Sequence, residues 1–144
     1  MFRSAHQDTF ARDHLPLPEQ WPSFVFDRPE LRYPERLNAA VELLDTTVAA
    51  GHGERIALRT DAAHCTYRAL QAQVDRIGRV LIDDLGLVPG QRVLLRGPNS
   101  PMMAACWLAV VKCGLIAVAT MPLLRARELV PVIEKAQVSA ALCD

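Results

Sequence analysis

The chain has 144 residues, and its sixteen basic side chains balance sixteen acidic ones, so the formal net charge is zero. A neutral chain has no overall positive field with which to attract nucleic acid or an anionic membrane. With 51% hydrophobic residues it is also too apolar to stay disordered, since disorder requires low hydrophobicity and high net charge. The composition therefore indicates one folded domain of ordinary size.

The four cysteines are scattered, and none belongs to a CxxC pair. This spacing disfavours a zinc knuckle and a thioredoxin-type redox pair, so we expect no metal site. The start of the chain shows no signal-peptide pattern, and together with the cysteine spacing this predicts a cytoplasmic protein with reduced thiols. Arginine greatly outnumbers lysine, which we interpret as a sign of a GC-rich bacterial genome.

Residues 1–34 contain five of the ten prolines, interleaved with large apolar side chains. Proline fixes φ and lacks an amide hydrogen, so this stretch is not expected to form a long helix or a central strand. We expect residues 1–34 to form an extended arm that lies against the surface of something larger, and residues 35–144 to form the folded βα part. The large apolar side chains of the arm are Trp21, Phe24, Phe26, Leu31 and Tyr33.

Periodic structure begins at Asn38, which can cap a helix that ends at Gly51. Two short strands are expected next, over residues 55–60 and 64–66, joined into a hairpin by a turn at residues 61–63. The apolar face of the helix is expected to comprise Ala40, Val41, Leu43, Leu44 and Val48.

A second helix follows the hairpin, and Thr66 is positioned to cap it. Apolar residues recur at intervals of three or four from Tyr67 to Leu85, which places them on one helical face. The opposite face, which we expect to be solvated, contains Gln71, Asp75, Arg79 and Asp83.

The remaining chain alternates strands with helices, and crossover helices between strands predict a mostly parallel sheet. The fold class is therefore α/β. Pro131 fits the last helix only if it falls in the first turn, where amide hydrogens have no partner. The expected strands cover 92–96, 115–120 and 138–143, and the expected helices cover 101–113 and 127–136.

Residues 97–124 contain a single charged side chain, Lys112, and are long enough to raise the question of a transmembrane helix. Prolines near both ends and Gly114 in the middle favour a buried helix followed by a buried strand instead. The large or sulfur-containing side chains of that helix are then expected to fill the core; they are Met102, Met103, Cys106, Trp107 and Cys113.

In parallel α/β sheets, ligands bind beyond the carboxyl ends of the strands. That rule selects the loop containing Asn99 and the loop formed by Met121, Pro122 and Leu123 as candidate substrate-binding positions. The alternative is that both are ordinary βα turns. No catalytic or metal-binding residue is expected, because no Walker-type, GxGxxG or GxSxG motif occurs and no two histidines share a helical face.

Several short motifs occur in an order that resembles the start of AMP-forming acyl-CoA synthetases, in the adenylate-forming ligase superfamily. The opening arm, with the stretch from Ala119 to Leu124, resembles the aryl-acid branch, the 2-aminobenzoate–CoA and benzoate–CoA ligases. Cys113 and Leu115 depart mildly from the pattern, because smaller residues usually flank that glycine. The motifs are Thr66-Tyr67-x-x-Leu70, Pro89-Gly90-Gln91-Arg92-Val93, Asn99-Ser100-Pro101, Ala109-x-x-Lys112-x-Gly114, Pro122 after a strand, and Glu128-Leu129.

The resemblance implies part of the N-terminal domain of an enzyme that activates an aryl carboxylate with ATP and transfers the acyl group to coenzyme A. Mg²⁺ would balance the phosphate charge. The phosphate loop, the adenine-binding stretch and the catalytic lysine of such enzymes lie beyond the resembling stretch, so the chain would be a fragment that is inactive alone. Asn99, Met121, Pro122 and Leu123 would form one rim of the acyl pocket, and the fragment would self-associate.

Two other classes of function fit the same residues. One is a free-standing βα module that binds a small ligand of its own. The other is a dimerisation or scaffold domain without catalysis. Both predict that the protein needs no further catalytic segment, whereas a ligase needs a phosphate-binding loop encoded after Asp144.

Overall fold

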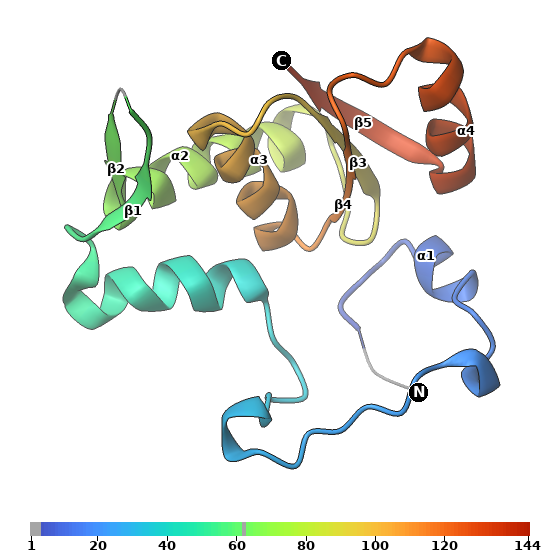
Figure 1. Cartoon of the computed structure of the whole chain (residues 1–144), viewed down its shortest axis with the longest axis horizontal. Helices are drawn as coiled ribbons and strands as arrows, with labels where there is room; N and C mark the ends of the chain where they lie inside the picture. Colours follow the sequence, from blue (N-terminus) through green and yellow to red (C-terminus); the bar gives the residue numbers. More distant parts are fainter. Residues whose placement is uncertain (1–3, 62) are drawn as a thin grey trace.

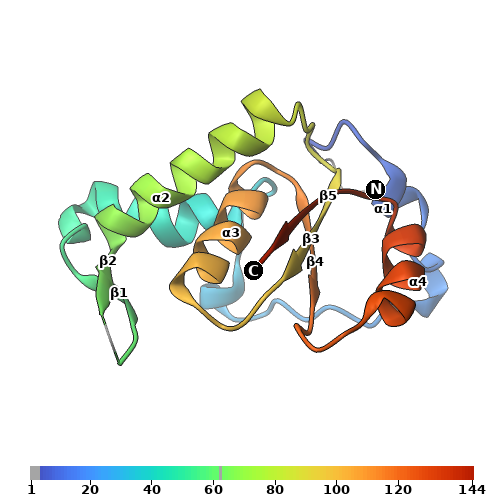
Figure 2. The ribbon, with the colours of Figure 1, turned by 90° about the horizontal axis from the view of Figure 1, so that it is seen from above.

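A three-stranded parallel sheet organises the computed structural model, which describes residues 4–61 and 63–144 (Figure 1). Strands β3 (Arg92–Arg96), β4 (Ile116–Thr120) and β5 (Val138–Cys143) pair in the order β4-β3-β5. Seen from above, helices α3 (Pro101–Lys112) and α4 (Ala126–Ala136) lie on opposite sides of this sheet (Figure 2). The predicted α/β class with a parallel sheet and crossover helices is confirmed.

The central strand β3 supplies the middle of the core. Val93 and Leu95 are 0% and 2% exposed and pack toward α3, whereas Leu94, at 3%, points to the other face of the sheet. The edge strand β4 is only half buried, contrary to the expectation of a fully buried strand, because its outer edge has no neighbouring strand among the described residues. The buried cluster on the α3 side comprises Leu44, Leu70, Val74, Leu81, Leu87, Val93, Leu95, Ala105, Ala109, Val110 and Leu115.

Helix α3 begins and ends as its sequence predicts. The hydroxyl of Ser100 accepts a hydrogen bond from the amide of Met103 at 3.1 Å, and Pro101 occupies the first helical position. Gly114 follows the helix with a φ of +70°, a conformation that favours glycine. The chain from 97 to 124 is thus a helix and a strand, as expected, and no helix within residues 4–61 and 63–144 combines the length and apolar character needed to span a bilayer.

Helix α2 (Tyr67–Arg79) continues into a wide turn, Val80–Asp84. Helix α2 packs against α3 (Figure 2). Thr66 caps it by accepting a hydrogen bond from Ala69 at 3.2 Å. The predicted apolar stripe is correct up to Leu81, but Leu85 is 51% exposed. The chain turns after Leu85, and Leu87 enters the core in its place.

The first predicted helix forms over residues 39–52, and it contains two wide turns, Val41–Asp45 and Val48–His52. Asn38 caps it as expected, since its side-chain oxygen accepts hydrogen bonds from the amides of Ala40 and Val41. Its predicted apolar face is only partly correct: Leu44 is buried, but Leu43 is 60% exposed. Wide turns hold more residues than an α-helical turn, so a face assigned from α-helical periodicity shifts.

The half-buried amine of Lys112 joins three helical segments. Its Nζ lies 2.7 Å from a carboxylate oxygen of Asp45 and 2.6 Å from one of Asp75, and Gln71 donates a 2.6 Å hydrogen bond to Asp45. On the face of α2 that is predicted to be solvated, Gln71 and Asp75 therefore contact the helix over residues 39–52 and α3. Arg79 and Asp83 on the same face are exposed, as predicted. Burial alone would lower the pKa of Lys112, but the hydrogen bonds it donates to the two carboxylates and the attraction of their negative charges together outweigh this effect and raise that pKa.

The hairpin strands β1 (Ile56–Arg59) and β2 (His64–Thr66) pair antiparallel, as predicted. The predicted turn at residues 61–63 includes Ala62, which lies outside the described residues. Helix α4 contains Pro131 at its sixth position, so the expectation that this proline needs the first turn is wrong. Pro131 lacks the amide hydrogen that would bond the carbonyl of Arg127, and both residues are exposed, so this break in the hydrogen-bond ladder lies on the surface of the domain.

The start of the arm docks on this core at the buried side chain of Arg92, which is 4% exposed. The carboxylate of Asp8 lies 2.7 Å from the Arg92 guanidinium, and the ring of Phe10 lies 4.7 Å beneath it. The amides of Gln7 and Asp8 donate hydrogen bonds to the carbonyl of Pro89. The arm also contains helix α1 (Phe10–Asp13) and single turns at Pro18–Gln20 and Pro29–Leu31.

We expect Asp8→Asn to release the first part of the arm, because the substitution leaves the buried Arg92 charge without its carboxylate. Trypsin should then cleave after Arg12 faster than in the unmodified chain. The hydrogen bond from Arg92, followed by the backbone hydrogen bond of Phe10, lowers the pKa of Asp8 below its usual 3.8. Above its lowered pKa the Asp8 carboxylate is charged, and this charge stabilises the docked arm. Protection of residues 7–13 against amide exchange should therefore be lost as the pH falls through the lowered pKa.

Asp27→Asn serves as the control, since Asp27 is exposed in the same arm and carries the same charge. Equal cleavage rates in the two variants would contradict the assigned role of Asp8.

We expect Lys112→Met to lower the free energy of unfolding by about 2 kcal/mol, because it removes charged hydrogen bonds to two partly buried carboxylates. One oxygen of Asp45 is already buried without a partner in the described structure, so this carboxylate is poorly compensated once the amine is gone. Urea unfolding measures the change, with Lys135→Met on the exposed face of α4 as the control. Equal losses in both variants would show that the Lys112 contacts contribute nothing specific.

Candidate groove at the carboxyl edge

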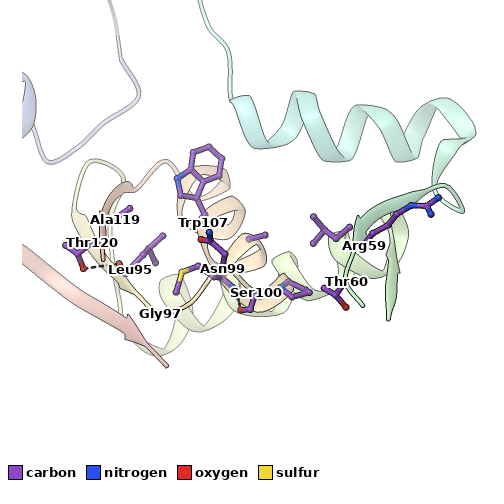
Figure 3. A pocket seen from close by; sticks show the side chains of 13 residues that line it. Arg59, Thr60, Leu95, Gly97, Asn99, Ser100, Trp107, Ala119 and Thr120 are labelled. Atoms are coloured by element: carbon purple, nitrogen blue, oxygen red, sulfur yellow. Dashed lines mark hydrogen bonds between the residues drawn. The ribbon is translucent and has the colours of Figure 1, made fainter. Parts of the chain in front are cut away.

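A groove of about 430 Å³ runs from the carboxyl edge of the sheet to the hairpin. The end of β3, the end of β4, the amino end of α3 and the hairpin all contribute to it (Figure 3). It lies where parallel α/β sheets bind ligands, beyond the strand ends. Its lining residues are Leu58, Arg59, Thr60, Leu95, Gly97, Asn99, Ser100, Pro101, Met103, Ala104, Trp107, Ala119 and Thr120.

Asn99 is one of the four predicted site residues, and the structure places it in this groove. The sharp loop after β3 brings it beside Ser100, whose side chain is occupied in capping α3. Thr120 reaches the same groove from the end of β4, and its hydroxyl donates a 3.4 Å hydrogen bond to the carbonyl of Leu95. Neighbouring strand ends therefore supply polar groups to one site.

The other three predicted site residues, Met121, Pro122 and Leu123, follow Thr120 directly but do not line the groove. Met121 is 65% exposed and Leu123 is 85% exposed, so their side chains project into solvent. The loop they form is nevertheless fixed: the Nη2 of Arg96 donates hydrogen bonds to the carbonyl of Pro122 at 2.6 Å and to that of Leu124 at 3.1 Å.

Trp107 forms a wall of the groove, which corrects the expectation that it fills the core. It is 40% exposed, and Met102 on the preceding turn of the helix is 53% exposed. The fully buried residues of α3 are Ala105, Ala109 and Val110, and the two alanines bring the helix close to the sheet and α2. Trp107 and Met102 are instead left on its outer face.

The chemistry of the groove is that of an apolar surface with a few neutral polar groups. Arg59 is the one cationic side chain among the lining residues, and it lies on the hairpin, at the opposite end of the groove from Thr120 (Figure 3). A triphosphate needs several converging cations or backbone amides, so the lining residues do not fit a nucleotide. We therefore assign no catalytic step to this groove.

The cysteines are free thiols, and burial raises the pKa of Cys106 and of Cys113 above the ordinary value. A raised pKa keeps these thiols protonated near neutral pH, so neither side chain is an activated nucleophile. Across residues 4–61 and 63–144, no three His, Cys, Asp or Glu side chains are grouped so as to hold a metal ion.

Sequence reasoning missed the contributions of Arg59, Trp107 and Arg96 to this edge. The hairpin approaches the groove only through tertiary packing, so no local pattern marks Arg59. Trp107 does carry a signal: the alanines of α3 define a close-packing face, and the tryptophan falls off it. Arg96 ends a strand of buried residues, and a charged side chain at such a strand end is a signal for a polar contact.

Residues 45–144 match the model of the AMP-binding enzyme family, and the chain therefore belongs to that family. It is 34% identical over 96 residues to a benzoate–CoA ligase of Thauera aromatica. The aligned residues cover 67% of this chain and 18% of that enzyme. This chain is 33% identical over 105 residues to a 3-hydroxybenzoate–CoA/4-hydroxybenzoate–CoA ligase of the same organism, covering 73% and 20%. The chain thus spans about a fifth of the length of these curated relatives.

Solved structures share the fold. An anthranilate CoA ligase in complex with anthranoyl-AMP superimposes with a TM-score of 0.67 at 24% identity, over 72% of this chain and 20% of that one. The N-terminal subdomain of Klebsiella oxytoca NpsA, in complex with 3-hydroxyanthranilyl-AMSN, gives a TM-score of 0.67 at 25% identity, over 75% and 27%. The expected likeness to the N-terminal domains of adenylate-forming enzymes is confirmed.

Proposed function

We propose that this chain is the N-terminal part of an AMP-forming acid–CoA ligase. The observation that carries the proposal is the match of residues 45–144 to the AMP-binding enzyme family. Such a ligase joins a carboxylate to ATP to give an acyl-adenylate and pyrophosphate, and then transfers the acyl group to the thiol of coenzyme A. ATP, Mg²⁺ and coenzyme A are therefore the proposed cofactors and co-substrates of the whole enzyme.

The proposed acid is an aryl carboxylate of the 2-aminobenzoate or benzoate type, as in the breakdown of aromatic acids. Support comes from the aryl-acid relatives, which are named as benzoate–CoA and hydroxybenzoate–CoA ligases. In this proposal Asn99, from the groove, and the neighbouring loop with Met121, Pro122 and Leu123 form one rim of the acid site. The free thiols are consistent with the reducing bacterial cytoplasm in which we place the enzyme.

The 144 residues by themselves should not catalyse the first step. Catalysis of this kind relies above all on preorganised charges around the reacting phosphates, and the sequence has no glycine-rich phosphate-binding motif. The purified chain should therefore show no pyrophosphate exchange into ATP that depends on 2-aminobenzoate or benzoate. The Thauera aromatica benzoate–CoA ligase, assayed in parallel, provides the positive control, and exchange by the short chain would contradict this prediction.

Translation of the native DNA past the codon for Asp144 tests the ligase assignment itself. We expect the open frame to continue into a loop rich in Ser, Thr and Gly, and later into the catalytic lysine. A stop codon directly after Asp144 would favour the free-standing binding or dimerisation module instead.

We further infer that residues 1–34 act as an arm on the folded part, residues 35–144, and that this chain self-associates through the arm. Phe24, Phe26 and Tyr33 are 60%, 55% and 61% exposed, and with Trp21 they form a row of rings. Neighbouring ring centroids lie 6.2 to 6.4 Å apart. An exposed apolar cluster of this kind usually marks an interaction surface.

Light scattering over a concentration series should show association that weakens at least about tenfold in dissociation constant when Phe24 and Phe26 are both changed to Ser. The control changes Leu15 and Leu17 to Ser, since these side chains are similarly exposed in the same arm but outside the row of rings. A chain that stays monomeric at high concentration would rule out the proposed self-association.

A further inference from the structure

We propose that Arg96 is a positioning residue for the acid-contacting loop, residues 121–124, and that it fixes the backbone of this loop against the carboxyl edge of the sheet. The inference rests on the proposed function, since it is the ligase assignment that gives this loop its substrate. Arg96 thereby joins the candidate site as a residue that acts through the loop, and its contacts explain how an exposed loop keeps its shape.

The geometry of the contact suits this role. The Nη2 atom of Arg96 carries two hydrogens, and it bonds the carbonyls of Pro122 at 2.6 Å and Leu124 at 3.1 Å. Within the loop, the amide of Leu124 also donates to the carbonyl of Met121 at 3.2 Å, closing a turn. A guanidinium nitrogen that spans two carbonyls two residues apart restrains the turn between them.

The loop has little else to hold it in place. Met121, Pro122 and Leu123 are exposed, so burial of their side chains contributes little to fixing the loop. Loops of this kind open locally at low free-energy cost unless their backbone groups are bonded. The two carbonyl bonds from Arg96 are therefore the main restraint described for the loop.

The guanidinium of Arg96 gives up one of its own hydrogen bonds in this arrangement. Its Nε is buried and has no hydrogen-bond partner in the described structure. An unpaired buried donor is unfavourable, so this orientation costs Arg96 the hydrogen bond that its Nε would make to water in an exposed position. Its orientation instead satisfies the loop carbonyls, as expected for a residue whose task is to hold the loop.

The backbone of Arg96 lies where all three strands of the sheet meet. In the sheet register it lies opposite Thr120 of β4 and Cys143 of β5. Its own carbonyl accepts a 3.1 Å hydrogen bond from the amide of Asp144. The backbone of Arg96 is thus fixed by both neighbours, and a fixed backbone is what a side chain needs in order to impose a position on another segment.

Hydrogen exchange of the 144-residue chain, followed by mass spectrometry, tests the proposal without any assay of catalysis. In Arg96→Ala we expect the amides of residues 123–126 to exchange roughly tenfold faster, while strand β4 keeps its protection. Arg96→Lys should fall between the two, because one ammonium cannot reproduce the planar fork of a guanidinium. Arg127→Ala, an exposed arginine in the first turn of α4, is the matched control and should leave the loop unchanged.

A rescue experiment separates positioning from a general loss of stability. Guanidinium ion at about 20 mM, far below denaturing concentrations, should restore protection of residues 123–126 in Arg96→Ala, whereas the same concentration of sodium should not. Unchanged exchange in Arg96→Ala, full protection in Arg96→Lys, or faster exchange spread through β4 with a lower unfolding midpoint would each overturn the proposal. None of these readouts depends on pyrophosphate exchange or on the reading frame, so failure here is distinct from failure of the ligase assignment.

Discussion

The buried guanidinium of Arg92 is the contact on which the arrangement of this fold depends. It is 4% exposed, and it donates hydrogen bonds to the carbonyls of Gly90, Ala136 and Gln137 while pairing with Asp8. A buried charge is tolerated only when it is paired and hydrogen-bonded, so these distant segments must meet at this point. The arm, the turn before β3 and the turn after α4 are thereby tied together at the amino end of the sheet.

Arg92 and Arg96 occupy opposite ends of β3, and both lie on the face of the strand away from Val93 and Leu95. Helix α4 has no buried residue, so its burial contributes little to holding it on the sheet. Arg96 binds the loop that leads into α4, and Arg92 binds the turn that leads out of it. The two arginines therefore fix both ends of a helix whose own side chains contribute little to its attachment.

Local rules predicted most of this fold from the sequence, and they failed where several segments meet. Caps at Thr66 and Ser100 and the period of α2 are properties of a few neighbouring residues, so they could be predicted directly. The exposure of Leu43 depends on wide helical turns, and the exposure of Leu85 depends on the bend that buries Leu87. Neither feature has a signal within one helical period.

The candidate site divides in the same way. The strand-end rule selected Asn99, which the structure places in the groove, because the order of strands and helices fixes where strand ends lie. It did not find the groove's wall at Trp107 or the approach of the hairpin, since both follow from how closely α3 packs on its neighbours. The pairing of Asp75 with Lys112 was missed for the same reason: helical periodicity identifies a polar face but does not show which element will cover it.

The way Arg96 holds its loop makes the position of the loop independent of the loop's side chains. Its bonds go to carbonyl oxygens of the loop and to none of the loop's side chains. Carbonyl groups are the same in every residue, so substitutions at Met121 or Leu123 leave the anchor intact. The loop can then present different side chains in one backbone shape, whereas a loop held by its own side-chain packing would move with each substitution. Backbone anchoring by a strand-end arginine thus separates the position of this loop from the chemistry of its side chains.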